Sequence, residues 1–158
     1  MGSESLTGRF DAFTLRPYAA ADEEAAIELW RRTWQEAYPR LDFAARVSWW
    51  RERWRRTLVP FARITLAERD GMLVGFVTVD AAGYLDQLVV EPEAWGSGAA
   101  AMLVAEAKRL APGGLTLHVN TDNARAIRFY QKHGFAITGA DVNPRSGVPV
   151  HKMSWRTA

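Results

Sequence analysis

Cysteine is absent from the 158-residue chain. Its absence excludes a disulfide framework, a cysteine nucleophile and a thiolate metal site, and it fits a reducing compartment. Long apolar runs are also absent, since no stretch approaches the roughly 18 residues of a membrane helix. The first residues, MGSESLTGRF, lack the apolar core of a signal peptide. We therefore expect a cytoplasmic protein with no membrane partner and no metal site.

An excess of charge of one sign is missing too. The 20 Lys and Arg residues nearly balance the 18 Asp and Glu residues and leave a net charge of +2. Binding to nucleic acid would require the basic residues to gather on one face. The arginines within residues 51–56 alternate with tryptophans at helical spacing, which is typical of the solvated side of an amphipathic helix. We expect no nucleic-acid partner and rank a nucleic-acid binder last among the functions considered.

The pattern along the chain predicts one α/β (α+β) domain over residues 1–158, with residues 1–11 as a flexible tail. Asp70-Gly71, between two strand-like runs, is a strong hairpin signal. We expect a mixed, mostly antiparallel sheet of about six to seven strands flanked by about four helices. The predicted helices are 22–38, 43–59, 98–111 and 124–133, and the predicted strands are 13–16, 64–69, 72–80, 84–90, 115–120, 136–142 and 150–155.

Residues 85–103, LDQLVVEPEAWGSGAAAML, run from an apolar strand through a proline into a glycine turn that opens a helix. Gly96 and Gly98 have no Cβ, so the backbone can turn sharply and bring its N–H groups together at the helix N-terminus. Such a turn suits a pyrophosphate. It lacks the three glycines of a dinucleotide fingerprint and the Gly-Lys-Ser/Thr of a P-loop, and taken alone it fits an ordinary strand-to-helix connection equally well.

A second segment, residues 118–135, reads HVNTDNARAIRFYQKHGF. It places Asn120 at the end of a strand, Asn123 at a helix N-cap position and Tyr130 along that helix. Together the two segments resemble the GNAT acetyltransferase superfamily. The first resembles the family's Gln/Arg-x-x-Gly-x-Gly/Ala turn, and the second resembles its Asn-x-x-Asn/Ala-x-x-Ala-x-x-Phe-Tyr-x-x-x-Gly-Phe run.

The resemblance implies that acetyl-CoA is the co-substrate and that the acetyl group passes to an amine by direct attack. The residues that it places against the coenzyme are Leu88, Val89, Val90, Trp95, Gly96, Ser97, Gly98, Ala99, Ala100, Asn120, Asn123, Ala126 and Phe129. It also places a backbone N–H near Val89 or Val90 against the thioester oxygen. Trp95 stands where the family has Gln or Arg. Because phosphate contacts in such turns come mainly from backbone N–H groups, we expect this departure to weaken coenzyme binding without abolishing it.

Acetyl transfer needs a proton donor for the leaving thiolate and a route for the amine proton. The resemblance points to Tyr130 as the donor, with core packing as the structural alternative. Asp86 is the first choice for the general base, because the family often carries a carboxylate on this central strand. Asp80, Glu91, His118 and a water relay stay open as alternatives.

The resemblance places the acceptor between the two N-terminal helices, where aromatic residues are plentiful. Trp30, Trp34 and Tyr38 are predicted to bind it, because aromatic faces attract a cationic amine. We therefore expect an N-acetyltransferase that acts on the primary amine of a small molecule. The alternatives are a protein N-terminal or lysine acetyltransferase and a module that binds acyl-CoA without turnover. A homodimer is a further expectation from the resemblance.

Overall fold

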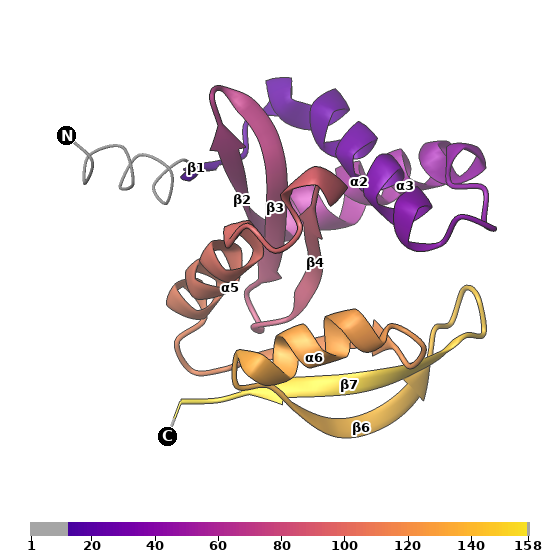
Figure 1. Ribbon diagram of the computed structural model, residues 1–158, viewed down its shortest axis with the longest axis vertical. Coiled ribbons are helices and arrows are strands. Elements are labelled where there is room, and N and C mark those ends of the chain that lie inside the picture. The colour runs from indigo at the N-terminus through magenta and orange to yellow at the C-terminus, as the bar shows by residue number, and fades with distance from the viewer. Residues whose placement is uncertain (1–12, 158) are drawn as a thin grey trace.

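The computed structural model describes residues 13–157, so the tail predicted over residues 1–11 lies outside the described part of the chain. The predicted α+β architecture is confirmed, with two antiparallel sheets joined by helices (Figure 1). The strands are β1 (Phe13–Pro17), β2 (Ala62–Arg69), β3 (Met72–Asp80), β4 (Leu85–Val90), β5 (Leu115–Asn120), β6 (Ala136–Val142) and β7 (Pro149–Trp155). No helix within residues 13–157 is long and apolar enough to cross a bilayer.

The helical segments are η1 (Ala20–Asp22), α2 (Glu23–Ala37), η2 (Ala44–Arg46), α3 (Val47–Arg53), η3 (Trp54–Leu58), α4 (Val59–Phe61), η4 (Pro92–Ala94), α5 (Ala99–Leu110) and α6 (Ala124–Lys132). The helix predicted over 43–59 is present as one uninterrupted helical run over 44–61, but it is not a regular α-helix, because a 3₁₀ turn precedes α3 and a π-helical segment, η3, follows it. The helical run continues through Pro60 to Phe61, because Pro60 stands in the first turn of α4, where a missing N–H is tolerated.

The first sheet has the strand order β1-β2-β3-β4 and carries the predicted hairpin. Asp70 and Gly71 join β2 to β3 with φ angles of +54° and +75°. Positive φ at both central residues is the geometry of a two-residue hairpin turn, and Asp and Gly adopt it at low cost. The hairpin prediction is therefore confirmed.

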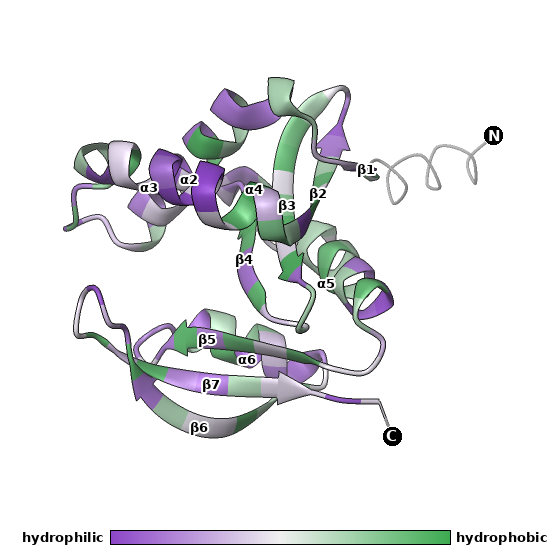
Figure 2. Ribbon diagram, turned by 180° about the vertical axis from the view of Figure 1, so that it is seen from behind, coloured by the Kyte–Doolittle hydropathy of each residue, from purple (hydrophilic) through white to green (hydrophobic). Residues whose placement is uncertain are grey.

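The second sheet has the order β5-β7-β6, so the strands do not form the single mixed sheet that was expected. A single isolated parallel bridge, between Tyr84 and Thr116, connects the two sheets at the start of β4. Beyond the bridge β4 and β5 separate, as Figure 2 shows. The sequence pattern identifies strands but not this parting, because both strands keep an apolar face toward the core.

The core lies on both faces of the first sheet. Residues 74–79 of β3 are all buried, with α5 against one face and α2 against the other. A strand covered on both faces reads as a continuous apolar run, as this one does. Figure 2 shows the hydrophobic residues of β3 between these helices and the hydrophilic residues of α2. Packing on one face of the first sheet therefore holds α5 and the turn before it in place. Packing on the other face holds α2 and α3 in place.

Candidate active site

The glycine turn after β4 has the backbone of an anion cradle. Gly96 and Gly98 have φ angles of +79° and +97°, and a Cβ at either position would meet open space. Their N–H groups, and that of Ala100, have no acceptor among residues 13–157. Ser97 Oγ accepts the N–H of Ala99 at 3.3 Å, and α5 begins at Ala99 with its positive dipole end at the turn. This geometry supports the predicted phosphate-binding role of residues 95–100.

Trp95 is held at the start of this turn by two contacts. Its Nε1–H donates to the carbonyl oxygen of Val90 at 2.7 Å, which ties the turn back to the end of β4. The guanidinium carbon of Arg125, in the first turn of α6, lies 3.9 Å from the centroid of the indole ring. The residue that departs from the expected pattern therefore stabilises the turn and lies beside a cation.

The parting of β4 and β5 leaves a free strand edge next to the turn. Thr116 N–H donates to Gly83 O at 3.0 Å beside the Tyr84–Thr116 bridge, and no ladder continues beyond it. Within the described residues, β3 is the only strand that forms a ladder with β4. An extended ligand can add to such an edge as a further strand. This is the role predicted for the backbone at residues 88–90.

The side chains predicted along the coenzyme path are themselves largely covered. Leu88 and Val90 pack into the core beside α5, whereas Val89 is 2% exposed and packs toward α2. Ala126 and Phe129 of α6 are half-buried against the same core as Leu88. The backbone of β4, rather than its side chains, is thus the part that can meet a ligand.

Helix α6 carries the predicted proton donor. Asn123 is its N-cap, as predicted, because Asn123 Oδ1 accepts the N–H of Ala126 at 3.2 Å. Tyr130 is 8% exposed and packs edge-to-face on Phe129, and its hydroxyl has no hydrogen-bond partner among residues 13–157. Burial, and secondarily the nearby Tyr84 phenol, raise the pKa of Tyr130 far above its usual value. The phenol therefore stays protonated and able to donate.

Asp86, the first choice for the base, is engaged in an ion pair. It is the unpaired residue of a bulge between β3 and β4, and its two oxygens accept hydrogen bonds from the guanidinium of Arg53, one of them at 2.9 Å. Gln87 Nε2 also donates to Asp86 Oδ1 at 2.9 Å. With both oxygens occupied, the contacts favour a structural role for Asp86, which joins α3 to β4.

The other carboxylates considered as bases are occupied as well. Asp80 Oδ1 accepts the N–H groups of Ala82 and Tyr84, each at 2.9 Å, in the turn before β4. Glu91 pairs with Arg32 at 3.2 Å. Both carboxylates therefore make contacts within the fold, although Asp80 Oδ2 has no hydrogen-bond partner among residues 13–157.

A different polar group lies where β4 and β5 part. The Tyr84 hydroxyl lies 2.8 Å from Nδ1 of His118, and His118 Nε2 lies 3.9 Å from Oδ2 of Asp141. Burial, and then the charge of Asp86, raise the pKa of Tyr84 to about 12, so the phenol is protonated at neutral pH and can donate to Nδ1 in the His118 tautomer that carries its proton on Nε2. His118 was among the expected alternatives, but Tyr84 was missed. A contact between residues 34 apart leaves no local pattern in the sequence.

The predicted aromatic wall divides between the core and the cleft. Trp30 is 4% exposed and stacks on Trp50 at 4.5 Å, so it is a core residue and the prediction that it contacts the acceptor is corrected. Trp34 and Tyr38 stack at 5.7 Å and are half-buried at the end of α2. These two stay predicted acceptor contacts.

Tyr38 also connects the acceptor side to the end of β5. Its hydroxyl accepts from Asn120 Nδ2 at 2.9 Å and donates to Asp122 Oδ1 at 3.0 Å. The amide of Asn120, predicted to bind the coenzyme, is therefore turned toward α2. These hydrogen bonds join the end of α2 to the end of β5. The end of β5 lies far along the strand from the Tyr84–Thr116 bridge.

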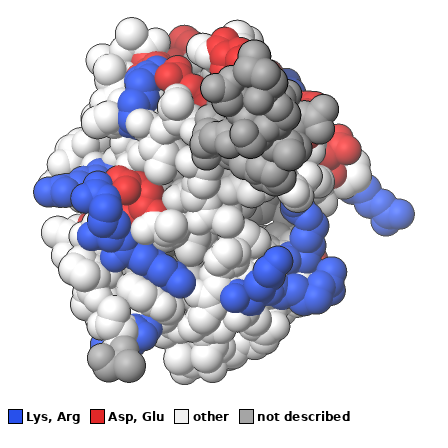
Figure 3. All heavy atoms as spheres, turned by 60° about the vertical axis from the view of Figure 1, so that its left-hand side comes forward, with Lys and Arg blue, Asp and Glu red and all other residues white. Residues whose placement is uncertain are grey.

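The arginine cluster of α3 and η3 is neutralised by carboxylates, which supports a solvated face and not a nucleic-acid surface. The pairs are Arg51–Glu24, Arg53–Asp86, Arg55–Glu23 and Arg56–Glu52. On the face shown in Figure 3, Lys and Arg form separate groups with uncharged surface between them. Within residues 13–157, no three His, Asp or Glu side chains lie close enough together to hold a metal ion.

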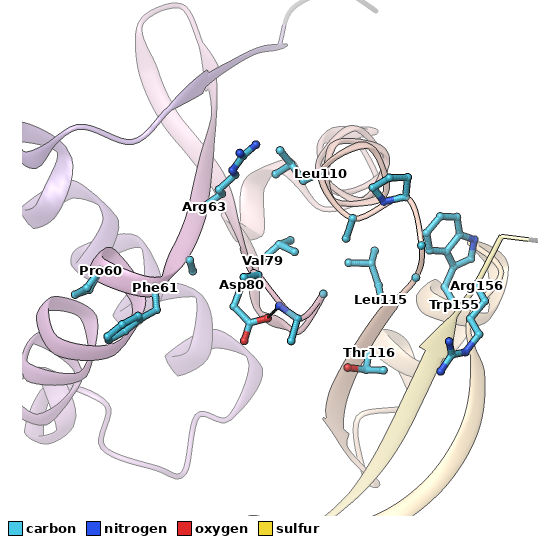
Figure 4. A pocket seen from close by; sticks show the side chains of 18 residues that line it. Pro60, Phe61, Arg63, Val79, Asp80, Leu110, Leu115, Thr116, Trp155 and Arg156 are labelled. Atoms are coloured by element: carbon cyan, nitrogen blue, oxygen red, sulfur yellow. Dashed lines mark hydrogen bonds between the residues drawn. The ribbon is translucent and has the colours of Figure 1, made fainter.

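A cavity of about 720 Å³ lies at the opposite end of the fold from the glycine turn (Figure 4). Its walls come from the end of α5, the start of β5 and the end of β7, with Arg63 and Arg156 on two sides. Asp80, one of the alternative bases, lines it, but none of the residues predicted to bind the coenzyme or the acceptor does. The candidate site is therefore the parting of β4 and β5 rather than this cavity.

Comparisons with known proteins identify the family of the chain. A model of the acetyltransferase (GNAT) family matches residues 23–135. The peptidyl-lysine N-acetyltransferase YjaB of Salmonella typhimurium is 36% identical over 127 residues, which cover 80% of this chain and 85% of that protein.

Solved structures give the same fold. The solution structure of apo YjaB from Escherichia coli aligns with a TM-score of 0.74 at 26% identity, over 92% of this chain and 99% of that one. The PaiA N-acetyltransferase of Thermoplasma acidophilum, solved with coenzyme A, aligns with a TM-score of 0.76 at 20% identity, over 92% and 99% of the two chains. At that identity the second likeness shows the fold alone.

Proposed function

This chain belongs to the acetyltransferase (GNAT) family, and we propose that it transfers the acetyl group of acetyl-CoA to the side-chain amine of a lysine in a protein or peptide. The observation that carries the proposal is the free edge of β4, which leads through η4 into a turn whose N–H groups at Gly96, Gly98 and Ala100 have no acceptor among residues 13–157. The pantetheine arm would add to that edge, and the pyrophosphate would occupy the turn.

The choice of lysine rests on the acceptor side and on the relatives. The bacterial proteins that match this chain over most of their length are named peptidyl-lysine acetyltransferases. The small-molecule amine first expected depended on an enclosing aromatic wall, and Trp30 does not contribute to it. The partly exposed Trp34 and Tyr38 suit the apolar stem and charged end of a lysine side chain.

The residues present can move both protons of the reaction. The lysine amine attacks the thioester carbonyl, and a β4 backbone N–H near Val89 or Val90 stabilises the oxyanion. The amine proton passes to the Tyr84 oxygen as the Tyr84 proton passes to His118 Nδ1, with Asp141 beside the imidazolium. The C–S bond then breaks, and Tyr130 gives its proton to the thiolate. The products are free coenzyme A and an acetylated amine.

The proposal is tested with three peptides of one sequence: a blocked N-terminus with one lysine, the same peptide with arginine in its place, and a free N-terminus with arginine. Thiol release can be followed directly, because the enzyme has no cysteine. We expect turnover with the first peptide alone. Turnover with the third instead would mean an N-terminal acetyltransferase. Coenzyme binding without turnover, on these peptides and on a panel of small amines, would mean a binding module.

A further inference from the structure

Arg125 stands out among the basic residues near the glycine turn. The neighbouring cation, Arg32, is paired with Glu91 and Glu93, to which it donates hydrogen bonds. Arg125 has no hydrogen bond or ion pair to any residue within 13–157, although its side chain is fixed against Trp95 at 3.9 Å. It is exposed, so its donors can reach a ligand.

The surroundings of Arg125 favour an anion. Neighbouring atoms remove part of the water around the guanidinium, which lowers its pKa, and no carboxylate among residues 13–157 offsets this partial desolvation. A guanidinium that lies on an aromatic face keeps its in-plane N–H donors free, and these match the oxygens of a phosphate two at a time. The turn next to it already presents unpaired backbone N–H groups of Gly96, Gly98 and Ala100.

We propose that Arg125 binds a phosphate of the coenzyme and that Trp95 positions it for this contact. The turn lacks the Gln or Arg side chain of the family pattern, and Arg125 then supplies a polar side chain from α6, across the indole ring. Trp95 makes two separate contacts: its N–H donates to Val90 O and holds the turn, and its ring packs against the Arg125 guanidinium. The inference rests on the proposed use of acetyl-CoA but not on the identity of the acceptor.

The test is calorimetric titration of coenzyme A into the wild type, Arg125→Gln, Arg125→Lys and, as a matched control, Lys132→Gln, which removes one charge from the last turn of the same helix. A charge-assisted hydrogen bond to phosphate predicts an increase in Kd of about tenfold or more for Arg125→Gln. We expect a smaller increase for Arg125→Lys, because lysine lacks the planar fork. For Lys132→Gln we expect an increase of less than about twofold, because Lys132 lies at the opposite end of α6 from Arg125.

Dephospho-CoA identifies the phosphate. If Arg125 binds the 3′-phosphate, Arg125→Gln weakens binding of coenzyme A but not of dephospho-CoA; if it binds the pyrophosphate, both are weakened equally. Trp95→Leu should weaken binding more in the wild type than in Arg125→Gln, because in that variant only the hydrogen bond to Val90 is still lost; the difference between the two effects measures how far Trp95 positions Arg125. An unchanged Kd in Arg125→Gln would overturn this inference alone, whereas a wild type that does not bind coenzyme A would overturn the proposed function with it.

Discussion

Replacing Tyr130 by Phe separates catalysis from folding more cleanly than any other change in this site. The hydroxyl of Tyr130 has no hydrogen-bond partner among residues 13–157, and the ring is packed between other aromatic side chains. Removal of the oxygen therefore breaks no contact within the described fold and opens no cavity larger than one atom. We expect the free energy of unfolding to change by less than about 0.5 kcal/mol.

The effect on turnover should be large by comparison. Loss of a positioned proton donor costs about 10²- to 10⁴-fold in rate, which corresponds to roughly 3–5 kcal/mol of transition-state stabilisation. The Kd for acetyl-CoA should change little, because the phosphate turn and the β4 edge are untouched. The difference in rate between the wild type and Tyr130→Phe should also become smaller when the leaving thiol is made more acidic, because a better leaving group needs less protonation.

Three measurements on one preparation check this prediction: thermal unfolding, calorimetric Kd for acetyl-CoA, and kcat by thiol release. A fall in kcat at unchanged Kd and stability is the expected result. If kcat changes by less than about threefold, Tyr130 is only a packing residue. A destabilised variant would show instead that the hydroxyl has a partner within the fold.

Three further predictions follow from named contacts. Gly75→Ala should lower stability by about 1–3 kcal/mol in denaturant titration, because the new Cβ would stand 2.8 Å from the carbonyl oxygen of Val89; an unchanged midpoint would show that β4 shifts freely. Hydrogen bonds from Arg16 lower the pKa of Asp22, so its contribution is complete above its unfolded pKa of 3.8 and is lost as the pH falls through the lowered folded value. The stability difference between the wild type and Asp22→Asn should therefore disappear in acid, and a difference that persists would contradict the assignment. His118→Ala should lower kcat by about 10²-fold at unchanged Kd for acetyl-CoA, and an unchanged kcat would favour the water relay.

Local signals in the sequence predicted most of the fold. Asp70-Gly71 forms the predicted hairpin, Asn123 caps the predicted helix, and Gly96 and Gly98 form the predicted sharp turn with positive φ angles. Each of these features depends on residues that lie within a few positions of one another in the sequence. Such features can be predicted from sequence because turns and helix caps are determined by neighbouring residues.

Contacts between distant segments were not predictable in the same way. Nothing local indicates that Asp86 meets Arg53, 33 residues away, or that the ring of Trp30 turns into the core instead of the cleft. The parting of β4 from β5 is likewise decided by how two separate strands pack. The chemistry of the candidate site rests on such pairings, so the base was the least predictable part of it.

The most direct test of the central claim is site-resolved mass spectrometry after incubation of the protein with acetyl-CoA and a blocked peptide that contains one lysine. We predict one added acetyl group, located on the lysine side chain, that is formed slowly or not at all by Tyr130→Phe. Absence of the acetylated peptide, while free amines of small molecules in the same mixture are acetylated, would contradict the assignment to lysine.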